Sequence, residues 1–407
     1  MARLQFLRDN APWLTAGALL TFGSSFGQTY FISIYSGVFR EEFDLSHTAW
    51  GSVYAIGTLA SAVAVLMLGG LADRYRTRLF ATIIMLMFAG VCLVTSRINA
   101  AWALPFVIFG LRFCGQGMMS HIAMVSVGRW FAAARGRAVS IAALGFSAGE
   151  ALLPLGFVAL MGVVGWRASW MVAAAVLMVM IVVLRMLLRN ERHPKGEAEI
   201  FGSVGMDGRQ WSRGDALRHW LFWVTLPGFL AQPVFGTAFF FQQVHLTEIK
   251  GWPLAGFVSL FPIYTASSVA SLLVGGWLVD RFGAGRVLPF YLLPLAAGFC
   301  VVAAAPSLTV AAFGLLLIGL MQGTSAATVG AYWPEYYGTR HLGAIRAVVS
   351  AFLVFASALG PAITGYLIDF GVDYRKQLVG MAAYCVVMSF VLGLAMAATR
   401  RTATVTV

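Results

Sequence analysis

Two stretches of the chain, GTLASAVAVLMLGGLADRY at residues 57–75 and YTASSVASLLVGGWLVDRF at residues 264–282, follow one pattern. Each is an apolar run that ends in a glycine, three variable residues, an aspartate and an arginine. The turn pairs Gly69 with Gly276, Asp73 with Asp280, and Arg74 with Arg281. A dipeptide earlier in each half repeats as well, as Phe26-Gly27 and Phe235-Gly236. The chain is therefore predicted to consist of two related halves in the same orientation.

Apolar runs like these fill most of the 407 residues, of which 60% are hydrophobic and 11% charged. Because a soluble domain has about 25% charged residues, a water-soluble fold is excluded. About 20 apolar residues span a bilayer as a helix. The sequence predicts an all-α membrane protein with twelve transmembrane helices in two pseudo-symmetric six-helix bundles. The expected spans are residues 13–38, 49–72, 79–97, 101–128, 137–163, 167–188, 219–245, 253–279, 286–305, 308–332, 342–369 and 376–398.

The longest polar stretch, residues 189–218, divides the spans six and six. It is predicted to be a cytoplasmic linker between an N-terminal bundle, residues 1–188, and a C-terminal bundle, residues 219–407. Its last part, DALRHW at residues 215–220, is expected to start a short interfacial helix.

The net charge of +12 comes from 28 lysines and arginines, most of which fall in loops on one side of the predicted spans. The positive-inside rule then places both termini in the cytoplasm of a bacterial-type inner membrane. This distribution disfavours nucleic-acid binding. The four cysteines lie in apolar runs at unrelated spacings, which indicates neither a disulfide framework nor a metal site. Because the sequence contains no nucleotide-binding loop or catalytic constellation, we expect a protein without enzymatic activity or cofactor.

The charged turn after the second and eighth expected spans resembles the signature loop of the major facilitator superfamily. Orientation charges alone would explain the arginines, but not the repeated glycine and aspartate. The resemblance implies a secondary active transporter with alternating access and a substrate site between its halves. It also implies a gate that stabilises the state closed to the cytoplasm, formed by Gly69, Asp73, Arg74, Gly276, Asp280 and Arg281. The glycine is expected to allow close helix contact.

Within that superfamily, two runs resemble the monocarboxylate and oxalate/formate transporter branch: Gly128-Arg129-Trp130-Phe131, and Trp333-Pro334-Glu335-Tyr336-Tyr337-Gly338. The resemblance implies transport of a small, monocarboxylate-like organic anion, coupled to protons or to anion exchange. Many members carry an arginine in the eighth span, whereas residues 253–279 are uncharged here. Two alternatives therefore stay open: efflux of a neutral or amphipathic compound, and a sensor without transport that keeps the fold. We expect a monomer whose partners are a small-molecule substrate, a proton or counter-anion, and membrane lipid.

Formal charges deep in the predicted spans are confined to Arg112 and Glu150. Arg112 is predicted to bind substrate and Glu150 to carry the coupled proton, but a purely structural ion pair remains an equal alternative. His121 is a second candidate for proton coupling, or a packed histidine. Amides and phenols in the spans are further candidate substrate ligands, although packing or an interhelical hydrogen bond is the better explanation for any one of them: Gln28, Tyr30, Gln232, Gln242, Tyr264 and Gln322.

Overall fold

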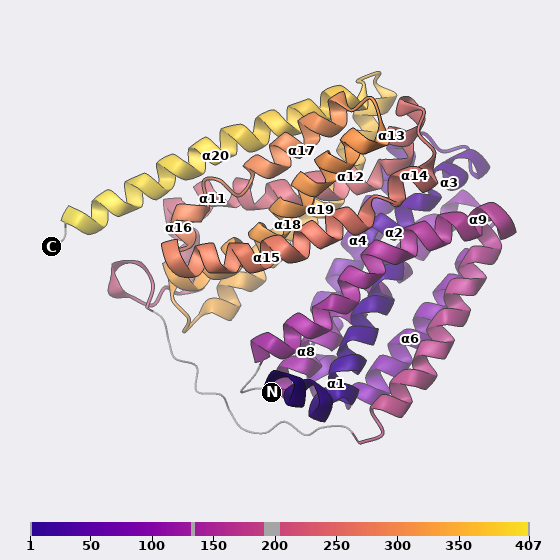
Figure 1. The fold of residues 1–407 in the computed structure, drawn as a ribbon, viewed down its shortest axis with the longest axis horizontal. Helices are drawn as coiled ribbons and strands as arrows, with labels where there is room; N and C mark the ends of the chain where they lie inside the picture. Colours follow the sequence, from indigo (N-terminus) through magenta and orange to yellow (C-terminus); the bar gives the residue numbers. More distant parts are fainter. Residues whose placement is uncertain (1, 132–134, 191–203, 406–407) are drawn as a thin grey trace. The chain divides into compact units, whose positions relative to one another are not determined.

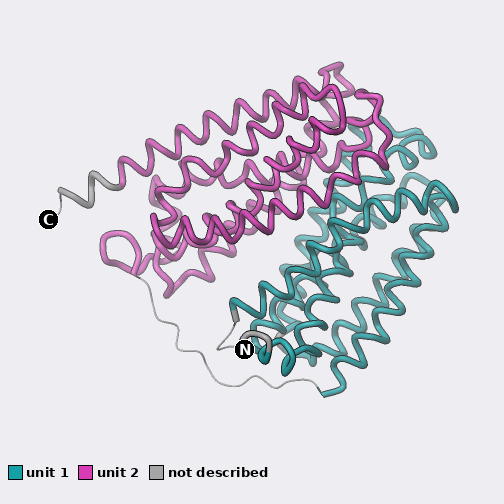
Figure 2. Tube along the Cα trace, viewed as in Figure 1, with its two compact units in different colours: residues 1–199 teal, residues 200–407 magenta. Residues whose placement is uncertain are grey.

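The computed structural model describes residues 2–131, 135–190 and 204–405, in which every regular element is a helix (Figure 1). The chain divides into two compact units, residues 1–199 and 200–407 (Figure 2). The end of the predicted linker thus falls in the second unit.

Unit 1 contains a series of helices, several of which are short segments of one span. They are α1 (Ala2–Ser24), η1 (Ser25–Gly27), α2 (Thr29–Ile32), η2 (Ser33–Tyr35), α3 (Ser36–Glu42), α4 (His47–Leu68), α5 (Leu71–Arg74), α6 (Thr77–Thr95), η3 (Ala101–Ala103), α7 (Leu104–Leu111), η4 (Arg112–Met119), α8 (Ser120–Trp130) and α9 (Arg135–Leu187).

The helix α9 holds two spans joined by a turn at Gly165, whose backbone has φ 79° and ψ 165°. Glycine is essentially the one residue that adopts this conformation without strain. The fifth and sixth expected spans are therefore connected directly, without a loop of their own.

Unit 2 repeats the pattern. Its helices are η6 (Met206–Gly208), α10 (Arg213–Arg218), α11 (Trp220–Ala231), η7 (Gln232–Gly236), α12 (Thr237–Phe241), α13 (Gln243–Lys250), α14 (Leu254–Val258), α15 (Phe261–Phe282), α16 (Ala284–Val287), α17 (Leu293–Ala304), α18 (Leu308–Tyr337), α19 (Leu342–Asp369) and α20 (Tyr374–Val405).

The described helices account for the twelve expected spans. Eight helical stretches are each long and apolar enough to cross a membrane, and one of them, residues 136–187, is the double span of α9. The first and fourth spans are not among these eight stretches; each is divided into several helical segments, and α1, the long segment of the first span, begins with the polar residues of the N-terminus. The ninth corresponds to the shorter apolar helix α17.

Small residues allow the spans of each unit to approach closely. In unit 1, a Cβ added at Gly145 or Gly149 of α9 would collide with the backbone of Ala18 and the hydroxyl of Ser25, respectively. In unit 2, Gly319 and Gly323 of α18 meet α15 in the same way. Hydroxyl groups add hydrogen bonds between spans, such as Thr21 Oγ1 to the Ala142 carbonyl at 2.5 Å. This packing is typical of membrane helices, which gain little from apolar burial against each other.

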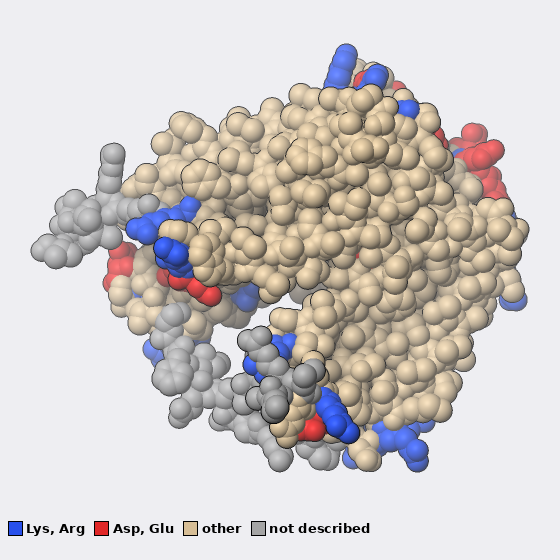
Figure 3. Space-filling view, viewed as in Figure 1, with Lys and Arg blue, Asp and Glu red and all other residues tan. Residues whose placement is uncertain are grey.

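The charged side chains lie near helix ends, whereas the middle parts of the helices present an uncharged surface on the visible face (Figure 3). Exposed large apolar side chains cover these middle parts, among them Leu86, Val179, Leu273 and Phe390. A surface of this kind matches the hydrocarbon of a bilayer.

The end of the predicted linker packs on unit 2. The backbone N–H of Trp211 donates to the Tyr337 carbonyl at 3.1 Å, and the Trp211 side chain is 5% exposed. Ser212 and Asp215 form a capping box at the start of α10, which confirms the short helix predicted there.

Candidate substrate site

The first span is interrupted at Gln28, whose backbone is extended with φ −87° and ψ 156°. The helix ends in the 3-10 turn η1 just before Gln28 and restarts as α2 at Thr29. The Gln28 side chain is 8% exposed and has no hydrogen-bond partner among the described residues. A broken helix leaves backbone groups without intrahelical partners, so such breaks within membranes are found where other groups satisfy them.

The break is shaped by the fourth span. A Cβ at Gly27 would lie 2.2 Å from the Leu111 carbonyl oxygen and 2.8 Å from the Cα of Gly115, so no larger residue fits there. The fourth span is itself irregular here, because residues Arg112–Met119 form the π-helix η4. Single π-turns inside α-helices occur frequently at functional sites.

Arg112, at the start of η4, reaches back to the break. Its Nη1 donates to the Gly27 carbonyl at 3.4 Å and to Thr29 Oγ1 at 3.3 Å. Thr29 also shares a 2.6 Å hydrogen bond with the Tyr54 hydroxyl, and the guanidinium lies 5.3 Å from the centre of the Tyr54 ring. Arg112 is 2% exposed, and its Nε has no hydrogen-bond partner in the described part of the chain. The partners of this buried cation are therefore all uncharged.

Arg112 and Glu150 are both described in the structure, and they do not form the structural ion pair that the sequence left open. Glu150 is 7% exposed and instead interacts electrostatically with Tyr30. The turn Ser25–Gly27 contacts both helices, through Gly149 of α9 and Gly115 of η4. Arg112 and Glu150 thus flank the same broken segment without meeting.

In unit 2, the structure brings together two of the predicted ligands. The Gln232 amide donates from Nε2 to Oε1 of Gln322 at 2.8 Å. Gln232 opens the π-helix η7, which ends at Gly236 of the repeated dipeptide. The first span of each half is therefore irregular at the repeated Phe-Gly dipeptide.

The other two predicted ligands of unit 2 lie apart from that amide pair. Gln242 donates to Thr364 Oγ1 at 3.1 Å and is 3% exposed. The Tyr264 ring packs edge-to-face on Phe240 at 5.1 Å between centroids.

The first signature loop is held by the fourth span. His121 Nε2 lies 3.1 Å from the Gly69 carbonyl, Arg129 Nη2 donates to the Ala72 carbonyl at 3.1 Å, and the Thr77 and Ser126 hydroxyls share a 2.8 Å hydrogen bond. His121 is thus in contact with the loop rather than with Arg112. The Arg74 side chain is exposed, and the side chain of Asp73 lies outside the described part of the structure.

The second signature loop is built differently. The expected close contact of Gly276 is absent, because a Cβ there would meet nothing within 4 Å; the neighbouring Gly275 faces Thr324 instead. Asp280 and Arg281 are exposed, and the Arg281 guanidinium lies 5.5 Å from the Trp277 ring centre.

Sequence reasoning missed Glu335 as part of this loop. Its Oε2 accepts a 2.7 Å hydrogen bond from the backbone N–H of Ala284, at the start of α16. The sequence feature that could have identified Glu335 is its position as an isolated acidic residue within an aromatic run. Thr29 and Tyr54, the neighbours of Arg112, carried no comparable signal.

The comparisons agree with this architecture. The family described as Major Facilitator Superfamily matches residues 17–269 and 257–406. A curated relative from Escherichia coli (strain K12), named "Probable L-galactonate transporter", is 23% identical over an alignment of 393 positions that covers 86% of this chain and 81% of that protein.

Two solved structures show the same fold. One is a bacterial homologue of the human lysosomal transporter Spinster, in an inward-facing and unoccupied conformation, with TM-score 0.73 and 14% identity over 96% of this chain and 98% of that one. The other is the nucleoside transporter NupG, with TM-score 0.71 and 13% identity over 94% and 98% of the two chains. The predicted family and fold are confirmed. The chain belongs to the Major Facilitator Superfamily, and it is a multi-pass membrane transporter of a small molecule rather than an enzyme.

Proposed function

We propose that this transporter carries a small organic anion, and that Arg112 binds its carboxylate during alternating access. One observation supports the assignment above others: a buried guanidinium whose contacts are all neutral. Its hydrogen bonds of 3.3 and 3.4 Å are long compared with the 2.7–2.9 Å of charge-assisted bonds. A buried charge without a counter-ion is costly, so a carboxylate in contact with Arg112 would be strongly favoured.

The amide of Gln28 and the phenol of Tyr30, on the broken segment beside Arg112, are the proposed neutral ligands in unit 1. They provide hydrogen bonds without the desolvation cost of a further charge. The named relative supports an acid substrate, because galactonate is a sugar carboxylate.

The coupled ion in this proposal is a proton carried by Glu150. The carboxylate interacts with Tyr30 of the broken segment, which Arg112 also contacts. Protonation of Glu150 would remove a negative charge close to the incoming anion and so favour its binding. His121, in contact with the Gly69 carbonyl, is proposed to relay the protonation state to the gate formed by the first signature loop, Asp73 and Arg74.

Proteoliposome uptake tests the substrate and the coupling together. Labelled L-galactonate and short monocarboxylates should be taken up by the wild type, and faster with an inwardly directed proton gradient. Arg112→Gln should abolish uptake and binding, whereas Glu150→Gln should keep exchange but lose the acceleration by the gradient. Normal binding of a carboxylate by a folded Arg112→Gln protein would refute the anion site.

A neutral substrate is the second candidate. The amide pair Gln232–Gln322 supports it, as does the eighth span, residues 253–279, which is uncharged and lacks the arginine that many relatives of the anion branch carry. Uptake of nucleosides and other neutral polar solutes belongs in the same panel. If Gln232→Leu abolishes uptake of such a solute while Arg112→Gln does not, the neutral candidate is preferred.

Orientation and assembly complete the proposal. The proposal puts the protein in the inner membrane with both termini in the cytoplasm, on the charge distribution of the loops, and it treats the transporter as a monomer. Cysteines introduced at residues 200 and 405 should react with an impermeant reagent from the cytoplasmic side alone. Labelling of either from outside would contradict this orientation.

A further inference from the structure

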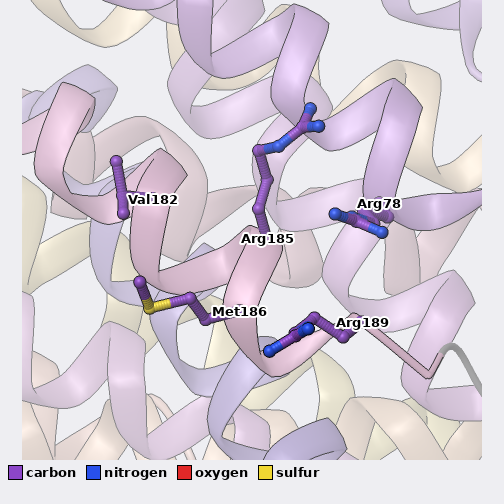
Figure 4. A pocket seen from close by; sticks show the side chains of 5 residues that line it. All are labelled: Arg78, Val182, Arg185, Met186 and Arg189. Atoms are coloured by element: carbon purple, nitrogen blue, oxygen red, sulfur yellow. The ribbon is translucent and has the colours of Figure 1, made fainter.

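Three arginines line one cavity at an end of unit 1. The cavity has a volume of about 370 Å³ and is lined by Arg78, Arg185, Arg189, Val182 and Met186 (Figure 4). Arg78 is the second residue of α6, whereas Arg185 and Arg189 lie at and just beyond the end of α9. These two helices pack against each other, so one antiparallel pair provides the whole lining.

The cavity has an excess of positive charge. None of the residues that line it is acidic. Arg185 and Arg189 are exposed, and among the described residues their side chains have neither a hydrogen bond nor an ion pair. The like charges of Arg185 and Arg189 in one cavity repel each other, and a bound anion would relieve that repulsion.

Orientation by the positive-inside rule explains why arginines are at this end, but not why they share a cavity with an apolar floor. Val182 and Met186 are 52% and 65% exposed. Positions 182, 186 and 189 follow a helical repeat and so share one face of α9. With a rise of 1.5 Å per residue, this face changes from apolar to cationic within about 10 Å along the helix axis.

The exposed apolar surface continues from the cavity along both helices. On α6, Leu79 and Ile83 are 51% and 45% exposed, and on α9, Val179 is 64% exposed. A soluble anion would use the guanidinium groups but leave this surface unmatched. An amphiphile with an anionic head and apolar chains would match both parts.

We propose that Arg78, Arg185 and Arg189 bind the phosphate headgroup of an anionic diacyl phospholipid, whose acyl chains lie along the exposed faces of α6 and α9. Basic clusters at membrane helix ends attract anionic lipids in this way. The site is separate from the proposed substrate ligands, and its occupation does not depend on which solute the protein carries.

Native mass spectrometry of the purified protein tests the proposal, with phosphatidylglycerol and phosphatidylcholine of identical acyl chains as probes. The wild type should retain phosphatidylglycerol preferentially. Each single change, Arg185→Gln or Arg189→Gln, should weaken that binding about fivefold, and the triple change with Arg78→Gln about a hundredfold. Phosphatidylcholine binding should not change.

A matched control removes three other exposed arginines, Arg213, Arg218 and Arg346, by substitution with glutamine. This variant has the same net charge as the triple variant and should retain phosphatidylglycerol like the wild type. Equal losses in the two variants would show a general effect of charge and overturn the site. Equal binding of the two lipids by the wild type would overturn it as well.

Two further measurements distinguish binding of a phosphate headgroup alone from binding of the whole lipid, and distinguish loss of binding from loss of folding. Free glycerol phosphate should compete weakly, because it lacks the acyl chains; competition as strong as that of the lipid would identify a soluble-anion site instead. If the triple glutamine variant does not fold, the single variants and a triple lysine variant decide. The lysine variant keeps the charge and should keep most of the phosphatidylglycerol binding.

Discussion

Gly27→Ala tests the link between the helix break and the arginine that contacts it. The added Cβ would lie 2.2 Å from the Leu111 carbonyl oxygen and 2.8 Å from the Cα of Gly115, and both are backbone atoms that no rotamer change can move away. An ordinary carbon–oxygen contact is about 3.3 Å, so the two spans must separate by about 1 Å. The bond from Arg112 to the Gly27 carbonyl, already 3.4 Å, would then be lost.

The expected cost is the sum of two effects. Overpacking costs about 1–3 kcal/mol, and loss of a hydrogen bond from a charged group about 1.5 kcal/mol. For a unit of about 200 residues, 1 kcal/mol corresponds to about 2–4 °C in melting temperature, so the variant should melt roughly 5–15 °C lower. Substrate binding should also weaken in this variant, because Arg112 loses its hydrogen bond to the carbonyl of residue 27.

Thermal unfolding followed by tryptophan fluorescence measures the effect, with Gly90→Ala as the matched control. A Cβ at Gly90, in α6, would meet nothing within 4 Å, so that change should shift the melting temperature by less than about 2 °C. If Gly27→Ala melts within about 2 °C of Gly90→Ala, the close contact at the break does not exist as described.

Three further predictions concern positions outside the break. Arg167 holds the pKa of Glu42 below its usual range. The pair therefore stabilises the fold above about pH 4.3, by less than about 1 kcal/mol. This contribution is lost as the pH falls through the lowered pKa of Glu42. The melting-temperature difference between the wild type and Glu42→Gln should therefore vanish in acid; a difference that persists there would contradict the assignment. Gly165→Ala should cost about 1–3 kcal/mol because of its backbone conformation, whereas Gly162→Ala, with open space around it, should be nearly neutral in the same melting assay. Glu335→Ala should cost about 1 kcal/mol and accelerate hydrogen exchange of the amide that opens α16, while Glu335→Gln keeps an acceptor and restores protection; unchanged exchange in the alanine variant would exclude the cap.

The number and order of the spans could be predicted from sequence because each is an apolar run of sufficient length. The repeated charged turn then indicated that the two halves are related and run in the same orientation. The break at Gln28 could not be predicted, because glycine and serine, which precede it at residues 23–27, are also common inside unbroken membrane helices. It depends on contacts with Leu111 and Gly115, which are distant in sequence.

The contacts of the candidate ligands also depend on residues that are distant in sequence, so they could not be predicted either. Gln232 and Gln322 were both selected for their polarity within spans, but their hydrogen bond joins residues 90 positions apart. Arg112 and Glu150 lie on consecutive spans, and sequence order does not reveal that residues 25–27 contact both helices. Polarity within an apolar run thus indicates which residues matter, whereas the angular position of each helix decides which of them meet.

The turn at Gly165 has a consequence for the order in which unit 1 assembles. The two arms of α9 are joined at Gly165 without a loop, so any contacts between them close to the turn are close in sequence, and the chain loses little entropy when it forms them. Contacts between α1 and α9 join residues more than a hundred positions apart, as Thr21 and Ala142 do. The α9 hairpin should therefore form early during membrane insertion, and the first span, with its break, should adopt its final form after the hairpin is present.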